Sequence, residues 1–343
     1  MRTCTWAPTT FQGTKIVARD AGPVLVPKGE QLVDFTTQIV KGYERIGVTD
    51  VLIAQRWWGT GEEIEGSSLD CLAMTSLFAA HTKKINMITA IHPGFFNPSV
   101  IAKWASTIDN LTGGRWAINV TSGWNMQEFD MYGIPKLDHD ARYKRSAEFI
   151  ELLQGAWNND VFDYEGKYYQ TQGLQLEPRP TTSLEVFQGG QSDGAIELAA
   201  NHSDWMFLNG GSMERISGVL SRVEEATRRT GRKVRFAMYA APICRETDQE
   251  AWDVVDGMLA RVNKALVEKR KSRTSGAEGM WGAEDDPLSV LDTNEGYASR
   301  LIGSPETILK RIEEYRKIGI EMLHMDLRDE LFNSEVLPLL PTL

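Results

Sequence analysis

The chain has 343 residues, of which 42% are hydrophobic and 24% are charged, so it is long enough to bury a large apolar core. Its 37 Lys and Arg against 47 Asp and Glu give a net charge of −10, and this acidic balance without a basic cluster excludes a protein that binds nucleic-acid backbones. No run of about 18 uncharged apolar residues occurs, which excludes a membrane-spanning helix.

The three cysteines are far apart and form no CxxC pair, so a disulfide framework is not expected. The first eight residues contain no apolar segment of signal-peptide length. Together these features predict a cytoplasmic protein.

Short β-branched or aromatic runs alternate with helical patterns along the chain. The short runs predict eight strands, at residues 2–8, 50–55, 85–91, 115–120, 185–188, 205–208, 234–242 and 322–327. Apolar residues at helical spacing predict helices at residues 31–46, 68–82, 98–111, 143–157, 195–201, 212–230, 249–271 and 305–318. The alternation predicts a (β/α)8 TIM barrel, with residues 1–343 as a single domain.

Two segments interrupt the alternation and are expected to be insertions. Residues 161–176 predict a hairpin around Glu165 and Gly166. Residues 272–296 are rich in Gly, Ser, Asp and Glu and predict a mobile loop.

In a (β/α)8 barrel the chemistry lies at the carboxyl ends of the strands. The predicted strand ends carry glycines beside side chains that can form hydrogen bonds. They are Gln55 and Arg56, His92, residues 119–124, residues 188–192, residues 209–211 and residues 326–328.

Metal and nucleotide-loop chemistry find no support in the pattern. The five histidines show no HxH or HExxH spacing, although His92 and His324 lie at predicted strand ends. Neither a GxxxxGK[ST] loop nor a GxGxxG turn is present. We therefore expect no metal site and no P-loop or Rossmann nucleotide site.

Residues 190–194 match G-x-S-x-G between a predicted strand and a predicted helix. With His324 later in the chain, Ser192 could be the nucleophile of a hydrolase. The same geometry could instead bind a phosphate through the backbone N–H groups of the glycines and the Ser192 hydroxyl at a helix N-terminus. The pattern alone leaves both open.

Several longer motifs carry a family resemblance. Residues 111–124 run LTGGRWAINVTSGW and are followed by Glu128, Phe129 and the run DHDARY at residues 138–143. Supporting runs are HPG at residues 92–94, FQGGQS at residues 187–192 and GSPET at residues 303–307. The combination resembles the bacterial luciferase-like flavin monooxygenases, in particular the branch with dimethylsulfone, pyrimidine and alkanesulfonate monooxygenases.

This resemblance implies a two-component monooxygenase in a (β/α)8 barrel. Such an enzyme takes reduced FMN from a separate NAD(P)H:flavin reductase, adds O2 to it in a flavin-peroxide type intermediate, and oxygenates a small organosulfur compound, here a sulfone such as dimethylsulfone. The alternatives are oxidative opening of a pyrimidine-like heterocycle, desulfonation of an alkanesulfonate, or a flavin-binding barrel without catalysis. The family forms homodimers or homotetramers.

The resemblance also implies which residues contact the flavin. The expected cofactor-binding residues are Gln55, Arg56, Asn119, Glu128, Arg142, Tyr143, Gly190 and Ser192. Arg142, Tyr143 and Ser192 offer donors to the FMN phosphate.

Asn119 and Trp124 are the expected catalytic residues. Asn119 would bond the isoalloxazine or the bound oxygen, and Trp124 would wall the flavin pocket against water. Taken singly, an Arg142–Glu128 ion pair, a turn at Asn119 and packing by Trp124 explain the same residues without a ligand.

One position departs from the family pattern. Ala90 stands where the pyrimidine enzyme is expected to place a threonine near the oxygen, and Thr89 lies on the opposite strand face. Both N5 and C4a of the flavin are therefore open as the site of oxygen addition. Residues 268–296 fall where the family carries a lid, and the same composition also fits a linker without a role.

Overall fold

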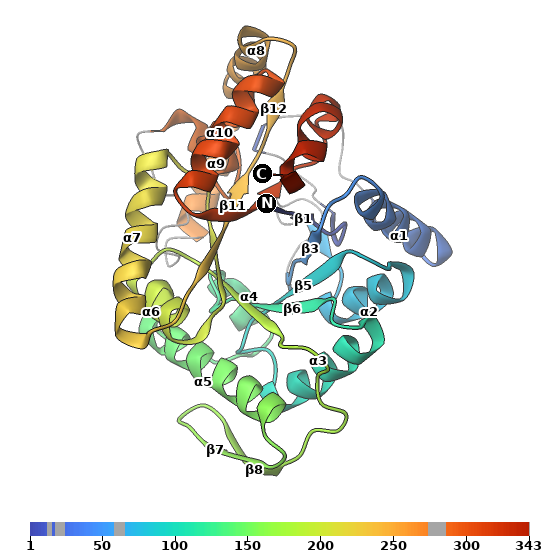
Figure 1. Ribbon diagram of the computed structural model, residues 1–343, viewed down its shortest axis with the longest axis vertical. Coiled ribbons are helices and arrows are strands. Elements are labelled where there is room, and N and C mark those ends of the chain that lie inside the picture. Colours follow the sequence, from blue (N-terminus) through green and yellow to red (C-terminus); the bar gives the residue numbers. More distant parts are fainter. Residues whose placement is uncertain (12–15, 18–24, 58–65, 274–285, 343) are drawn as a thin grey trace.

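The computed structural model describes residues 1–11, 16–17, 25–57, 66–273 and 286–342. Eight parallel strands close into a barrel in the order β1-β14-β11-β10-β9-β6-β5-β3, which confirms the predicted fold class (Figure 1). The barrel strands are β1 (Arg2–Trp6), β3 (Asp50–Ile53), β5 (Asn86–Ile91), β6 (Trp116–Val120), β9 (Glu185–Gly189), β10 (Trp205–Leu208), β11 (Arg235–Ala240) and β14 (Ile320–Met325).

Helices surround the ring of strands in Figure 1. The described α-helices are α1 (Glu30–Arg45), α2 (Cys71–His81), α3 (Pro98–Thr112), α4 (Met126–Met131), α5 (His139–Asn158), α6 (Asp193–His202), α7 (Met213–Thr230), α8 (Asp248–Leu259), α9 (Lys264–Arg273) and α10 (Pro305–Lys317). The two ends of the chain meet, since the Met1 amino group donates to the Leu340 carbonyl oxygen at 3.0 Å. Among the described helices, none combines the length and the apolar content needed to cross a bilayer.

Alternate residues of each strand face the inside and the outside of the barrel. One buried cluster takes a single residue from every barrel strand and fills the interior: Cys4, Leu52, Ile88, Ala117, Phe187, Trp205, Ala237 and Met322. A larger cluster, which includes Val51, Ile118 and Leu323, packs the outer faces of the strands against the helices. The barrel is therefore a packed core whose free edge lies at the strand ends.

A polar layer closes the barrel where the strands begin. Arg2 donates to Asp50 Oδ2 at 3.0 Å and to Glu185 Oε2 at 2.8 Å. Arg235 pairs with Glu185 and lies 4.1 Å from the Trp205 ring centroid. The charges are thus compensated within the layer, as the fully buried Asp50 carboxylate requires.

The predicted hairpin is confirmed as β7 (Phe162–Glu165) and β8 (Gln170–Leu174), which pair in antiparallel fashion. Glu148 on α5 accepts hydrogen bonds from the backbone N–H groups of Lys167 and Tyr168, at 2.9 and 2.7 Å. These bonds fix the hairpin to the outside of the barrel.

The single helix expected at residues 249–271 is wrong, because the chain turns between α8 and α9. Val262 forms a bridge with Val17, and the Asn263 N–H donates to the Ile16 carbonyl oxygen at 2.8 Å. Asn263 Oδ1 then accepts from the Leu266 N–H at 3.2 Å and starts a new helix. A contact with a segment some 245 residues away thus overrides a continuous local pattern.

The expected start of the second helix at Ser68 is also wrong. Residues Ser67–Ser68 form a short strand, β4, that pairs with β2 (Thr10–Phe11). Asp70 is the actual cap, since its carboxylate accepts from the Ala73 N–H at 2.7 Å.

Two further boundaries differ near the expected site. Helix α5 begins at His139 rather than Tyr143, because Asp138 caps it by accepting from the Ala141 N–H at 2.7 Å. Helix α4, capped by Asn125, was not expected at all. Arg142 consequently lies in the first turn of α5, and Tyr143 follows directly after it.

The mobile loop expected at residues 272–296 is wrong for its described part. Residues 274–285 lie outside the described residues, so the expected lid over residues 268–296 stays a prediction. Pro287–Val290 form a 3-10 helix, and the side chains of Leu288, Leu291 and Glu295 are buried. Residues 286–296 are therefore a packed part of the barrel mouth.

Candidate functional site

Three buried polar side chains lie at neighbouring strand ends. Gln55 follows β3, His92 follows β5, and Asn119 lies near the end of β6. Gln55 Oε1 accepts from the His92 N–H at 2.6 Å. Within the described residues, Gln55 Nε2, His92 Nδ1 and Asn119 Oδ1 have no hydrogen-bond partner. Buried polar atoms are normally satisfied, so this edge of the barrel has the character of a ligand site.

The charge state of His92 follows from its surroundings. Burial lowers the pKa of His92 to about 3, and the nearby guanidinium groups of Arg56 and Arg145 add to the effect. His92 is therefore a neutral imidazole at physiological pH.

Ala90 and Asn119 are register partners on adjacent strands and share the inward face. Thr89 faces outward, where its hydroxyl lies 2.7 Å from that of Thr75 and accepts from Trp116 Nε1 at 2.9 Å. The expectation that Thr89 lies on the opposite strand face is confirmed. No hydroxyl from this position reaches the barrel interior.

A cradle of small and hydroxyl-bearing residues lies at the N-terminus of α6. Ser192 caps the helix, and its Oγ donates to the Tyr143 hydroxyl at 3.3 Å. Gly190 has a φ of +124°, a backbone conformation that favours glycine. A Cβ at Gly194 would lie only 2.8 Å from the Tyr143 ring, so this position has room only for glycine. The Tyr143 ring therefore packs directly against the backbone of a helix N-terminus, which is a ready anion site.

The two histidines singled out in the sequence do not serve Ser192. The Ser192 Oγ bonds are to the Tyr143 hydroxyl and the Ala195 N–H, and neither group is a base. His324 lies inside the barrel with its ring centroid 4.7 Å from that of Trp6, and burial lowers the pKa of His324 to about 3. This geometry lacks the nucleophile–base contact of a hydrolase. The described residues also hold no group of three His, Cys, Asp or Glu side chains able to bind a metal.

Contacts of four expected site residues hold the loops after β3 and β6 in place. Arg142 donates to the Gly123 carbonyl oxygen at 2.5 Å. The Arg56 guanidinium lies 4.8 Å from the Trp124 ring centroid. Glu128 Oε1 accepts from the Trp57 N–H at 3.1 Å. These residues shape the rim of the barrel mouth between the two strands.

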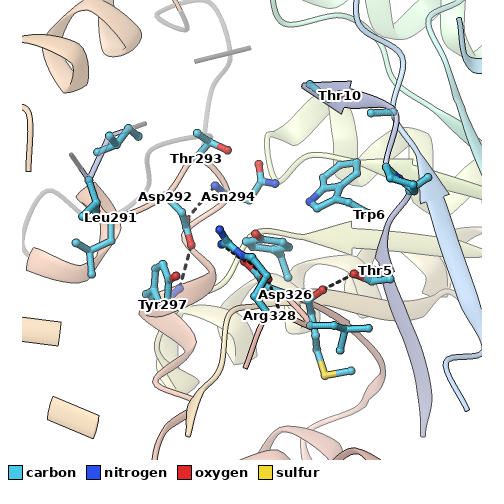
Figure 2. A pocket seen from close by; sticks show the side chains of 18 of the residues that line it. Thr5, Trp6, Thr10, Leu291, Asp292, Thr293, Asn294, Tyr297, Asp326 and Arg328 are labelled. Atoms are coloured by element: carbon cyan, nitrogen blue, oxygen red, sulfur yellow. Dashed lines mark hydrogen bonds and ion pairs between the residues drawn. The ribbon is translucent and has the colours of Figure 1, made fainter. Parts of the chain in front are cut away.

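A cavity of about 420 Å³ opens on the other side of the mouth (Figure 2). Trp6 at the end of β1 lies across the cavity from Asp292 and Tyr297, and Asp326 follows β14. Of the expected site residues, Arg56 is the one that lines this cavity.

Most residues of this cavity wall were not expected from the sequence. The unexpected residues include Trp6, Tyr239, Asp292, Asn294 and Tyr297. Trp6 and Tyr239 lie on predicted strands and could have been suspected. Asp292 lay in an expected mobile loop, and its sequence gives no signal for this position.

A buried ion pair ties the cavity wall to the cradle. Glu295 is fully buried and pairs with Arg215 at the start of α7. Arg215 Nη2 also donates to Gln191 Oε1, next to Ser192, at 3.3 Å. At Gly210 a Cβ would lie 2.1 Å from the Glu295 carbonyl oxygen, so the segment is held close to the end of β10.

Comparisons with known proteins agree with this geometry. Residues 11–322 match the family described as luciferase-like monooxygenase. The chain is 34% identical over 338 residues to an FMNH(2)-dependent dimethylsulfone monooxygenase of Pseudomonas putida, with 93% of this chain and 92% of the relative covered.

Two solved structures share the fold. A long-chain alkane monooxygenase (LadA) superposes with a TM-score of 0.79 at 19% identity, covering 100% of this chain and 91% of the other. DmoA from Hyphomicrobium sulfonivorans superposes with a TM-score of 0.78 at 18% identity, covering 100% and 88%. The chain is a member of the luciferase-like monooxygenase family.

Proposed function

We propose that the protein is a reduced-FMN-dependent monooxygenase that oxygenates a small organosulfur compound, with dimethylsulfone as the first candidate. The observation that supports this most is the combination at one barrel mouth of an anion cradle with two buried amide atoms, Gln55 Nε2 and Asn119 Oδ1, that lack partners among the described residues. The 34% identity to a dimethylsulfone monooxygenase over 93% of the chain supports the choice of substrate.

The residues of the cradle fit the phosphate end of FMN. Tyr143 and Ser192 offer hydroxyl donors, Gly190 leaves room for close approach, and the α6 N-terminus offers backbone N–H groups. Arg142, one residue before Tyr143, supplies a positive charge.

The strand-end amides fit the ring end of the flavin. Gln55 Nε2 is a donor and Asn119 Oδ1 is an acceptor, and both are buried. Glu128 holds the loop after β3 in place through the Trp57 N–H. We assign Asn119 to orienting the ring and Trp124 to excluding water. Reduced flavin supplies the oxygen chemistry when it is bound.

The partners follow from the same proposal. Reduced FMN would arrive from a separate NAD(P)H:flavin reductase, and O2 and the sulfone would be co-substrates. A single-domain chain that assembles as a homodimer or homotetramer is the expected form.

An anaerobic titration with reduced FMN, followed by rapid mixing with O2, tests the proposal. With dimethylsulfone present, we expect oxygen from O2 in the product and less peroxide release than without it. Flavin oxidation without a sulfone product would redirect the search to uracil-like rings and alkanesulfonates. Absence of reduced-FMN binding would overturn the proposal.

Replacing Tyr143 by phenylalanine is expected to weaken reduced-FMN binding about three- to fivefold, because one hydroxyl donor and its bond to Ser192 are lost. The matched control is Tyr164→Phe on the outer hairpin, where the Tyr164 hydroxyl donates to Glu151 Oε2 on α5 at 2.5 Å. Equal dissociation constants for the two variants would remove Tyr143 from the phosphate end.

A further inference from the structure

Charged and ionisable side chains gather in the wall of the 420 Å³ cavity. They come from five parts of the chain that meet at the barrel mouth, as Figure 2 shows for the labelled residues. Two groups that face Asp292, Glu295 and Tyr297, lie on its own segment. The others are Tyr239 on β11 and the pair Asp326 and Arg328 after β14. Arg56 and Tyr43 line the same cavity.

The Asp292 carboxylate is held in a fixed position in this wall. It accepts from the backbone N–H groups of Asn294 at 3.1 Å, Gly296 at 3.0 Å and Tyr297 at 3.3 Å. Figure 2 shows it on the side of the cavity opposite Trp6. A carboxylate anchored in this way cannot turn away from a ligand in the cavity.

Asp326, the other carboxylate among the described lining residues, is already neutralised. Arg328 Nε donates to Asp326 Oδ1 at 2.8 Å and to Asp326 Oδ2 at 2.7 Å, a close pairing of guanidinium and carboxylate. Arg56 stacks on Trp124 and has no carboxylate partner within the described residues. The charge balance of the cavity therefore depends on Asp292.

Burial, with a smaller contribution from Glu295, raises the pKa of Asp292 to about 7 against the opposing effect of the backbone N–H groups. Above this pH the Asp292 carboxylate is ionised, and its negative charge offsets the positive charge of Arg56. Below it the described residues of the cavity wall carry a net positive charge. An anionic ligand is then favoured at low pH and disfavoured at high pH.

The rest of the wall suits an uncharged ligand with acceptor oxygens. Tyr43, Tyr239 and Asn294 offer donors, and Met258 and Met325 offer apolar contact. Sulfonyl oxygens are acceptors only, and the alkyl groups of a sulfone need apolar surface.

We propose that Asp292 is the specificity-determining residue of this cavity, and that its carboxylate excludes anionic sulfonates and sulfinates while uncharged sulfones are admitted. The proposal deepens the proposed function and rests on it for the identity of the sulfone, but the charge effect itself can be measured without turnover.

Calorimetric binding of methanesulfonate to the full-length protein, with and without saturating FMN, tests this inference. For the native protein we expect the methanesulfonate Kd to rise about tenfold between pH 7.5 and 8.5, with proton uptake on binding, while the dimethylsulfone Kd stays constant. For Asp292→Asn we expect no pH slope and at least tenfold tighter methanesulfonate binding at pH 8.5. Asp256→Asn, on the exposed side of α8, should behave like the native protein.

Methanesulfonate binding at pH 8.5 that is no tighter in Asp292→Asn than in the native protein overturns the inference. A native protein without the pH slope overturns it as well, and this arm does not depend on the variant folding. If the pH slope is present but no sulfone is oxygenated, the proposed function fails while the role of Asp292 stands.

Discussion

Replacing Arg215 by alanine is expected to lower the free energy of unfolding by about 3 kcal/mol, the lower end of the range for breaking a buried ion pair. The reason is that Glu295 is fully buried and would lose its guanidinium partner. The Gln191 side chain would lose a bond at the same time. Urea unfolding followed by circular dichroism measures the change.

The matched control lies on the same helix. Arg229→Ala removes an exposed pair with Glu197, with side chains 67% and 58% exposed, and should cost less than about 1 kcal/mol. If both variants lose the same stability, Arg215 does not act through a buried pair.

Replacing Arg142 by alanine is expected to weaken reduced-FMN binding more than tenfold, about 1.4 kcal/mol or more. Arg142 is only 4% exposed and lies in the first turn of α5 beside the cradle. Its bond to the Gly123 carbonyl oxygen also fixes the loop that carries Trp124. Fluorescence titration under anaerobic conditions measures the dissociation constant.

Lys144→Ala provides the comparison, since Lys144 is exposed two residues further along the same helix. It should bind reduced FMN as the native protein does. An Arg142→Ala affinity within twofold of the native value would exclude Arg142 from the phosphate end.

The barrel could be predicted from the sequence because each of its strands is short, apolar and separated by a helical pattern. The continuous apolar run at residues 51–53 is buried on both faces of β3, as such runs predict. The turn at Asn263 could not be predicted, since it depends on pairing with Ile16 and Val17 across the fold. Local periodicity carries no information about such a contact.

The cradle at Tyr143 and Ser192 and the cavity wall at Asp292 also differ in how far the sequence predicts them. Tyr143 and Ser192 were expected together through the family resemblance, and their hydroxyl groups do lie 3.3 Å apart, although their role stays a prediction. The wall made by Trp6, Tyr239 and Asp292 was not expected, because it depends on how β1, β11 and the segment after α9 come together. A sequence pattern predicts where strands end, but it does not predict which loop folds over those ends.

A polar layer closes the barrel at the end where the strands begin. It is formed by Arg2, Asp50, Glu185 and Arg235. The entrance is therefore the opposite end, at the carboxyl ends of the strands. Whatever reaches the inward-facing side chains above the packed interior, such as Tyr239, must enter and leave over the same rim. A flat ligand that lies across that rim covers the entrance, so it separates the barrel interior from bulk water. Changes to the rim can then alter what is admitted without touching the ion pairs that seal the base.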